Sequence, residues 1–225
     1  MKKIMRFAGA VIIGALVLAG ASVMASSSGP GISAEEALKS LMDGNKRYVD
    51  GKARGIMMHD QAARNKLVAG QKPYAIILSC SDSRVPPELV FDKGLGEIFV
   101  VRVAGNVVEK GAILGSIEYA AEHLGVPLVM VLGHEKCGAV KATVESKGHA
   151  EGNIGSIVAA IAPAIGRAKG ADPEDVADAN LDMVKENLTA VSPVLAKIVA
   201  EGRLKIVTGK YHMDHGDVVL RDGLK

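Results

Sequence analysis

Two short polar motifs hold the residue types best suited to chemistry in this chain. Cys80, Asp82 and Arg84 stand at alternate positions, and His134 and Cys137 follow further along the sequence. Cys80 and Cys137 are the only cysteines. Two thiolates and one imidazole form the ligand set of catalytic zinc sites that keep a fourth coordination position open. The pattern therefore predicts one zinc ion per chain, bound by Cys80, His134 and Cys137.

Each motif directly follows an apolar run of strand length. Residues 74–78 precede the first motif and residues 126–132 precede the second, and neither run contains a charged residue. Such runs are typical of buried strands in a parallel sheet. Ligands of open parallel sheets bind beyond the carboxyl ends of the strands. We therefore expect both motifs at the same edge of one sheet.

Helical and strand patterns alternate along the rest of the chain, which predicts an α/β fold with a mostly parallel central sheet flanked by helices. Ser33 and Glu36 form a capping box at the start of a helix over Ala34–Tyr48. The other expected helices are Asp60–Val68, a turn within Pro86–Asp92, Gly111–Leu124, Cys137–Val144, Ile154–Ala168 and Asp172–Ala200, with a kink or break at Pro193. The other expected strands are Glu97–Val103, Leu204–Thr208 and Asp217–Leu220.

The N-terminus carries the pattern of a secretory signal peptide. A basic start, residues 1–6, precedes the uncharged run Phe7–Ala25. We expect cleavage after Ala25, a flexible linker over 26–32 and a single domain over 33–225. This predicts an exported or periplasmic protein without stable membrane association, and an uncleaved membrane anchor is the alternative.

The charge balance excludes one class of partner. The chain has 27 Lys and Arg against 25 Asp and Glu, and three of the basic residues lie in the first six positions. Because the rest has no basic stripe, we expect no nucleic-acid binding. In an exported chain the two cysteines could instead form a disulfide, but a disulfide would leave the neighbouring His134 and Asp82 unexplained.

Three motifs taken together form a specific signature: Cys80-x-Asp82-x-Arg84, Ala104-Gly105-Asn106 and His134-x-x-Cys137. They resemble the signature of the β-class carbonic anhydrases, and the similarity runs from about Ser33 to the C-terminus. The resemblance implies a zinc enzyme that interconverts carbon dioxide and bicarbonate through a zinc-bound hydroxide. It also implies a homodimer or homotetramer whose N-terminal helices reach over the partner subunit.

Asp82 has two possible roles beside the predicted zinc. As a fourth ligand it would close the site, whereas in a bidentate pair with Arg84 it would leave room for water and could accept a hydrogen bond from it. The resemblance implies that both states occur in the family and that some members switch with pH. We expect Arg84 to hold Asp82 at alkaline pH and the two to act as a catalytic pair. A purely structural ion pair is the alternative.

The resemblance further implies a substrate pocket, whose expected residues are Gln71, Phe99, Ala104, Gly105, Asn106, Tyr119 and Gly138. Gln71 would donate a hydrogen bond to a substrate oxygen, while Phe99 and Tyr119 would keep the pocket apolar or simply fill the core. Ala104 is smaller than the valine often found there. Ile77 replaces the tryptophan typical of members with an allosteric bicarbonate pocket, which argues against such regulation here.

Other functions use the same residues differently. A zinc enzyme of this kind could hydrolyse carbon disulfide or carbonyl sulfide. A non-catalytic zinc-binding protein would keep Asp82 on the metal permanently. His212 and His215 could form a second metal pair, but no cysteine or glutamate accompanies them.

Overall fold

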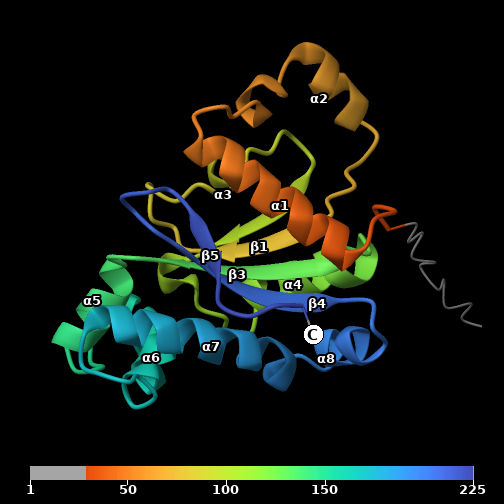
Figure 1. Ribbon diagram of the computed structural model, residues 1–225. Coiled ribbons are helices and arrows are strands. Elements are labelled where there is room, and N and C mark those ends of the chain that lie inside the picture. The colour runs from red at the N-terminus through yellow and green to blue at the C-terminus, as the bar shows by residue number, and fades with distance from the viewer. Residues whose placement is uncertain (1–28, 225) are drawn as a thin grey trace, which may run out of the picture.

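The apolar runs of the sequence form one twisted sheet in the computed structural model, which describes residues 29–224 (Figure 1). The strands of these residues are β1 (Ala75–Ser79), β2 (Ile98–Arg102), β3 (Leu128–His134), β4 (Lys205–Tyr211) and β5 (Val218–Leu220). Their order is β2-β1-β3-β4-β5, and only β5 pairs antiparallel to its neighbour. The predicted mostly parallel sheet is confirmed.

Helices cover both faces of this sheet (Figure 1). They are α1 (Ala34–Val49), α2 (Gln61–Leu67), α3 (Pro87–Val90), α4 (Ala112–His123), α5 (Gly138–Glu145), α6 (Ile154–Ile165), α7 (Pro173–Val191) and α8 (Pro193–Ala200), with single 3-10 turns over Gly55–Met57 and Ala104–Asn106. The predicted helices are confirmed. The break expected at Pro193 falls at Ser192, whose extended backbone separates α7 from α8.

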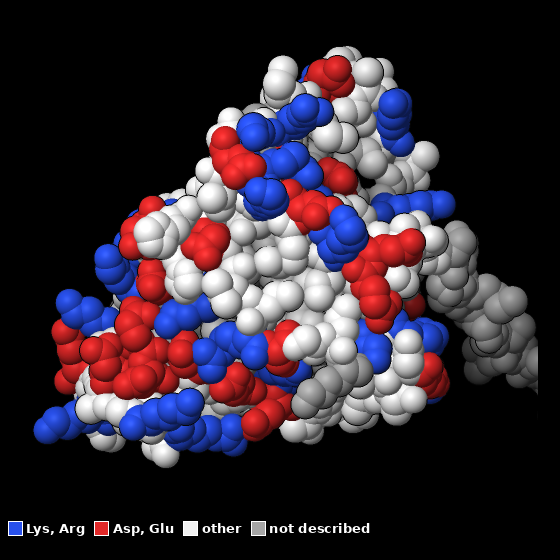
Figure 2. Space-filling view, viewed as in Figure 1, with Lys and Arg blue, Asp and Glu red and all other residues white. Residues whose placement is uncertain are grey.

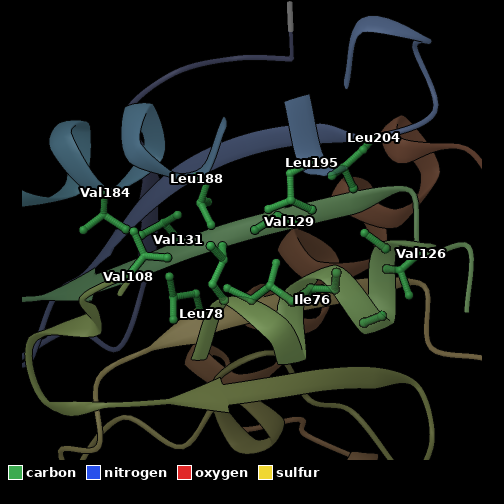
Figure 3. Packing of buried hydrophobic residues seen from close by; sticks show 14 of the residues in the cluster. Ile76, Leu78, Val108, Val126, Val129, Val131, Val184, Leu188, Leu195 and Leu204 are labelled. Atoms are coloured by element: carbon green, nitrogen blue, oxygen red, sulfur yellow. The ribbon is translucent and has the colours of Figure 1, made fainter. Parts of the chain in front are cut away.

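Alternate residues of the strands supply two separate cores. Ile76 and Leu78 of β1 face α4, α7 and α8, where they pack with Val129 and Val131 of β3 and Leu188 of α7 (Figure 3). Ile77 and Met130 face the opposite side and pack beneath α1. Both strands are buried on both faces, which explains why their sequences show uninterrupted apolar runs.

Helix α1 is fixed at its start and along its buried face. Ser33 and Glu36 form the predicted capping box. Asn45 is buried, and its side chain donates to the backbone oxygens of Val90 and Gly216 and accepts from the N–H of Val218. The satisfied amide therefore ties α1 to α3 and to the start of β5.

The predicted signal segment 1–25 and the first three residues of the linker, 26–28, lie outside the described residues. No helix among residues 29–224 combines the length and the apolar character needed to cross a bilayer.

Candidate metal centre

The three predicted ligands converge at the carboxyl ends of neighbouring strands. Cys80 follows β1, His134 is the last residue of β3, and Cys137 is the N-cap residue of α5. Ser79 pairs with Leu132 in the parallel register, so the two strand ends are adjacent. One ligand atom from each residue lies within 4.8 Å of the others, and all three residues are buried. Among the described residues, only these three His, Cys, Asp or Glu side chains form such a group.

The imidazole of His134 is oriented for metal binding. Its Nδ1 lies 2.8 Å from the carbonyl oxygen of Glu135. Because a carbonyl only accepts hydrogen bonds, Nδ1 carries the proton and Nε2 has a free lone pair. The buried Nε2 has no hydrogen-bond partner within the described chain. An unpartnered buried nitrogen beside two thiols fits a metal ion.

The two thiols also fit a cation between them. The contact with Cys137 lowers the pKa of Cys80 to about 4, and burial only partly opposes this. The same contact, together with burial, raises the pKa of Cys137. The pair therefore retains one proton, and a bound cation would allow both sulfurs to ionise as ligands.

Asp82 is paired with Arg84 beside this cluster. The guanidinium donates from Nε to Oδ1 at 2.9 Å and from Nη2 to Oδ2 at 2.7 Å, and the Arg84 N–H adds a bond at 3.0 Å. These donors hold the pKa of Asp82 well below its usual range, against the opposing effect of burial. Its Oδ2 lies 4.0 Å from His134 Nε2. The carboxylate therefore faces the cluster while both of its oxygens are bound by Arg84.

Comparisons with known proteins agree with this geometry. A family model described as carbonic anhydrase matches residues 75–218, which include all three ligands. Carbonic anhydrase 2 of Mycobacterium tuberculosis is 41% identical over 195 residues, covering 83% of this chain and 92% of the relative. The solved β-carbonic anhydrase of Coccomyxa in complex with acetazolamide is 26% identical, with a TM-score of 0.66, covering 84% of this chain and 87% of that one. The chain belongs to the β-class carbonic anhydrases.

As the sequence predicted, the protein is an enzyme of reversible carbon dioxide hydration. A further solved structure shares the fold of this carbonic anhydrase. It comes from Sordaria macrospora, where two β-carbonic anhydrases are described as tetrameric, and it is 24% identical with a TM-score of 0.63. The match covers 85% of this chain and 98% of that one.

The loop over Ala104–Asn106 lies behind the first ligand of this carbonic anhydrase. The N–H of Gly105 donates to Cys80 Sγ at 3.3 Å, and its carbonyl accepts from Asn180 Nδ2 at 3.0 Å. Gly105 has a φ of +70°, which a residue with a side chain rarely adopts. Gly138 follows Cys137 as the first residue of α5. The structure thus brings Gly105 and Gly138 next to the ligands.

Three other expected pocket residues do not lie at the ligand cluster of their own chain. Gln71 precedes β1 and lines a hollow of about 510 Å³ with His123, whereas Cys80 follows the other end of that strand. Phe99 and Tyr119 are ring neighbours at 6.3 Å, and Phe99 pairs with Ile76 near the start of β1. The length of β1, roughly 17 Å for five residues, lies between the two groups.

The histidine pair considered as a second metal site is engaged elsewhere. His212 Nδ1 lies 3.2 Å from an oxygen of Asp217. His215 Nε2 lies 3.5 Å from Asp214. Each imidazole thus has its own carboxylate neighbour, and within residues 29–224 neither belongs to a group of three possible ligands.

Arg102 is a site residue that the sequence did not reveal. From the end of β2, its Nε donates to the carbonyl of Cys80 at 2.9 Å and its Nη2 to the carbonyl of Asp82 at 2.5 Å. One side chain therefore fixes the backbone on both sides of Ser81. The sequence offered one indication of this role: Arg102 is a charged residue at the end of an apolar strand, shortly before the Ala104-Gly105-Asn106 motif.

Proposed function

We propose that the metal of this carbonic anhydrase is zinc, held by Cys80 Sγ, His134 Nε2 and Cys137 Sγ. The buried cluster and the free lone pair of Nε2 support this assignment. Zinc, when bound, supplies the Lewis acidity that activates water for attack on carbon dioxide. The three ligands leave a fourth position for that water.

Asp82 and Arg84 form the catalytic pair in this proposal. The observation that carries it is the two-pronged contact of Arg84 with a carboxylate that faces the ligand cluster. Arg84 keeps Asp82 ionised and occupies both of its oxygens, so the carboxylate can accept a hydrogen bond from water without becoming a metal ligand itself. Asp82 would thus accept a hydrogen bond from the water and orient it for attack.

Two substitutions test the pair. Asp82→Asn removes the charge, and we expect the hydration rate to fall about 10- to 100-fold while zinc content stays unchanged. Arg84→Met frees the carboxylate, and we expect lower activity together with tighter zinc binding, because Asp82 then becomes a fourth ligand. Arg203→Met is the matched control, since it removes an exposed ion pair with Glu201 on the surface, away from the cluster.

Stopped-flow hydration rates and metal content, measured on the same samples, distinguish the outcomes. Full activity of Asp82→Asn at wild-type zinc content would show that the pair is a structural ion pair. Equal loss of activity in the Arg203→Met control would show that the assay reports general damage rather than the site.

We also propose that the enzyme acts as a dimer or tetramer of identical chains. Helix α2 has no buried residue and stands away from the sheet (Figure 1). Next to it, Met57 and Val68 are 76% and 84% exposed, which is unusual for large apolar side chains. A second copy over this surface would cover them. The predicted pocket role of Gln71 and Tyr119 likewise requires a second copy whose cluster lies against them.

Sedimentation velocity tests the assembly. We expect a dimer or larger even oligomer for residues 26–225, and a shift toward monomer for Val68→Glu at the same concentration. Lys52→Glu on the loop after α1, where the side chain is already exposed and charged, is the control. A monomeric wild-type chain would contradict the proposal.

Residues 1–25 are proposed to export the enzyme. The basic start and the uncharged run Phe7–Ala25 support this assignment. N-terminal sequencing of the protein made from the full gene should find Ser26 as the first residue. An intact Met1 or a membrane-bound product would instead favour an uncleaved anchor.

A further inference from the structure

The backbone of Lys136 lies between two ligands and is held from both sides by side chains. Its φ is +53°, in the left-handed region that costs a non-glycine residue about 1–2 kcal/mol. Its N–H donates to Glu174 Oε1 at 2.7 Å, and its carbonyl accepts from Arg84 Nη2 at 3.2 Å. Contacts from other segments therefore maintain an unfavourable conformation directly before Cys137.

Glu174 reaches this loop from the first turn of α7. The helix start is already capped by Asp172, whose side chain accepts the N–H of Glu174 at 2.8 Å. The carboxylate of Glu174 is therefore not needed for capping. Although 41% of the side chain is exposed, its Oε2 atom is shielded from solvent.

Lys210 orients that carboxylate from β4. Its Nζ lies 2.9 Å from Glu174 Oε2 and 2.9 Å from Asp178 Oδ1, and only 13% of its side chain is exposed. Arg221 Nη1 binds the other oxygen of Asp178 at 2.7 Å. Figure 2 shows acidic and basic side chains interleaved over the end of the molecule where α5, α6 and α7 lie. Lys210 is nevertheless partly buried within this group, where ion pairs are screened less than at the surface.

The strand register connects Lys210 directly to the metal loop. Lys210 pairs with Gly133, and the next pair joins Tyr211 to His134. The N–H of Glu135 also donates to the carbonyl of Tyr211 at 3.1 Å. The pairing of β3 with β4 thus fixes Lys210 relative to the metal loop. Glu174 contacts Lys210 through one carboxylate oxygen and the N–H of Lys136 through the other.

We propose that Glu174, oriented by Lys210, is a positioning residue for the metal centre. It fixes the peptide of Lys136 and thereby sets Cys137 and Arg84 in place. Without the Glu174 acceptor, Lys136 is free to leave its left-handed conformation. A change in its φ and ψ would shift the neighbouring Cys137 and move the Lys136 carbonyl that Arg84 binds.

This inference rests on the proposed zinc site, and its test uses metal affinity as well as activity. Outer contacts that orient ligands typically change metal affinity or activity about 10- to 100-fold when removed. We expect Glu174→Ala to weaken zinc binding in chelator competition by about that factor and to lower kcat. Glu174→Gln keeps an acceptor for Lys136 but loses the charge facing Lys210, so its loss should be smaller.

Two further variants separate positioning from general stability. Glu186→Gln is the matched control, because Glu186 lies on the same helix and, among the described residues, forms an ion pair only with Arg167, at 2.6 Å. It should keep wild-type zinc affinity. Lys210→Met should weaken zinc binding as Glu174→Gln does, and the effects of Lys210→Met and Glu174→Ala should not add, because they act through one contact.

Wild-type zinc affinity and kcat in Glu174→Ala would overturn the inference. If Glu174→Ala does not fold, unchanged zinc affinity in both Glu174→Gln and Lys210→Met would overturn it instead. A wild-type protein that binds no zinc would refute the proposed metal centre itself, so the two failures are distinguishable.

Discussion

Replacing Gly105 by alanine tests how tightly the loop behind the first ligand is built. A Cβ at this position would lie 2.6 Å from Ile161 Cδ1 and 3.3 Å from Ala139 Cβ. The loop cannot shift to avoid them without cost, because the Gly105 N–H binds Cys80 Sγ and its carbonyl binds Asn180. The substitution therefore combines backbone strain with overpacking.

The expected magnitude follows from these two effects. The left-handed conformation of Gly105 costs alanine about 1–2 kcal/mol. Overpacking a core typically costs about 1–3 kcal/mol. Because Ile161 Cδ1 is the end of a flexible side chain, we expect the lower part of the combined range, about 2–4 kcal/mol of unfolding free energy.

Urea denaturation of the zinc-depleted protein at a fixed concentration measures this loss. Ile161→Val removes Cδ1, so the double variant should recover much of the overpacking cost, less the roughly 0.5–1.5 kcal/mol that an Ile→Val change itself costs. Gly138→Ala is the matched control, since a Cβ there meets no atom of the described residues within 4 Å. A Gly105→Ala protein within about 0.5 kcal/mol of wild type would refute the reasoning.

Two further predictions concern the residues that hold loops in place. Burial opposes ionisation of Asp92, but the N–H of Gly55 and the guanidinium of Arg47 outweigh it and lower its pKa. Its stabilising contribution is thus complete above the unfolded carboxyl pKa of about 3.9 and is lost as pH falls through the lower folded-state pKa. In Asp92→Asn, the free energy of unfolding should therefore fall less steeply as the pH is lowered into the acid range. An unchanged slope would contradict this. Arg102→Met should release zinc to a chelator about tenfold faster, because the carbonyls of Cys80 and Asp82 lose their Arg102 donors. A wild-type release rate would show that the loop keeps its conformation without Arg102.

The ligand set could be predicted from the sequence because each ligand follows a recognisable strand. The apolar runs before Cys80 and His134 define buried parallel strands, and the carboxyl ends of such strands meet at one edge. The capping box of α1 and the break before Pro193 could be predicted for a similar reason. In each case the residues that determine where a helix begins or ends lie within a few positions of that helix end.

Arg102, Glu174 and Lys210 could not be found in this way. Their partners are backbone groups or charges of segments distant in the sequence. A charged residue at a strand end or in the first turn of a helix usually faces solvent. The surrounding sequence looks the same when the residue instead contacts the protein interior. Only the assembled fold shows which of these side chains reach the metal loop.

The position of Gln71 shows a different limit. The resemblance placed it in the pocket, yet it precedes β1 whereas Cys80 follows β1. Strand direction alone puts these two residues at opposite ends of the sheet. A role for Gln71 beside the ligands therefore requires the ligands of another copy of the chain. Contacts between two copies cannot be predicted from the sequence pattern of one chain.

Carbon dioxide hydration by zinc-loaded and zinc-depleted wild-type protein, residues 26–225, tests the central claim most directly. Stopped-flow rates and metal content would be measured on the same samples. We predict one zinc per chain, loss of activity when a chelator removes it and recovery when zinc returns. A zinc-free protein that keeps its activity, or one zinc per chain without hydration, would contradict zinc-dependent hydration at this centre.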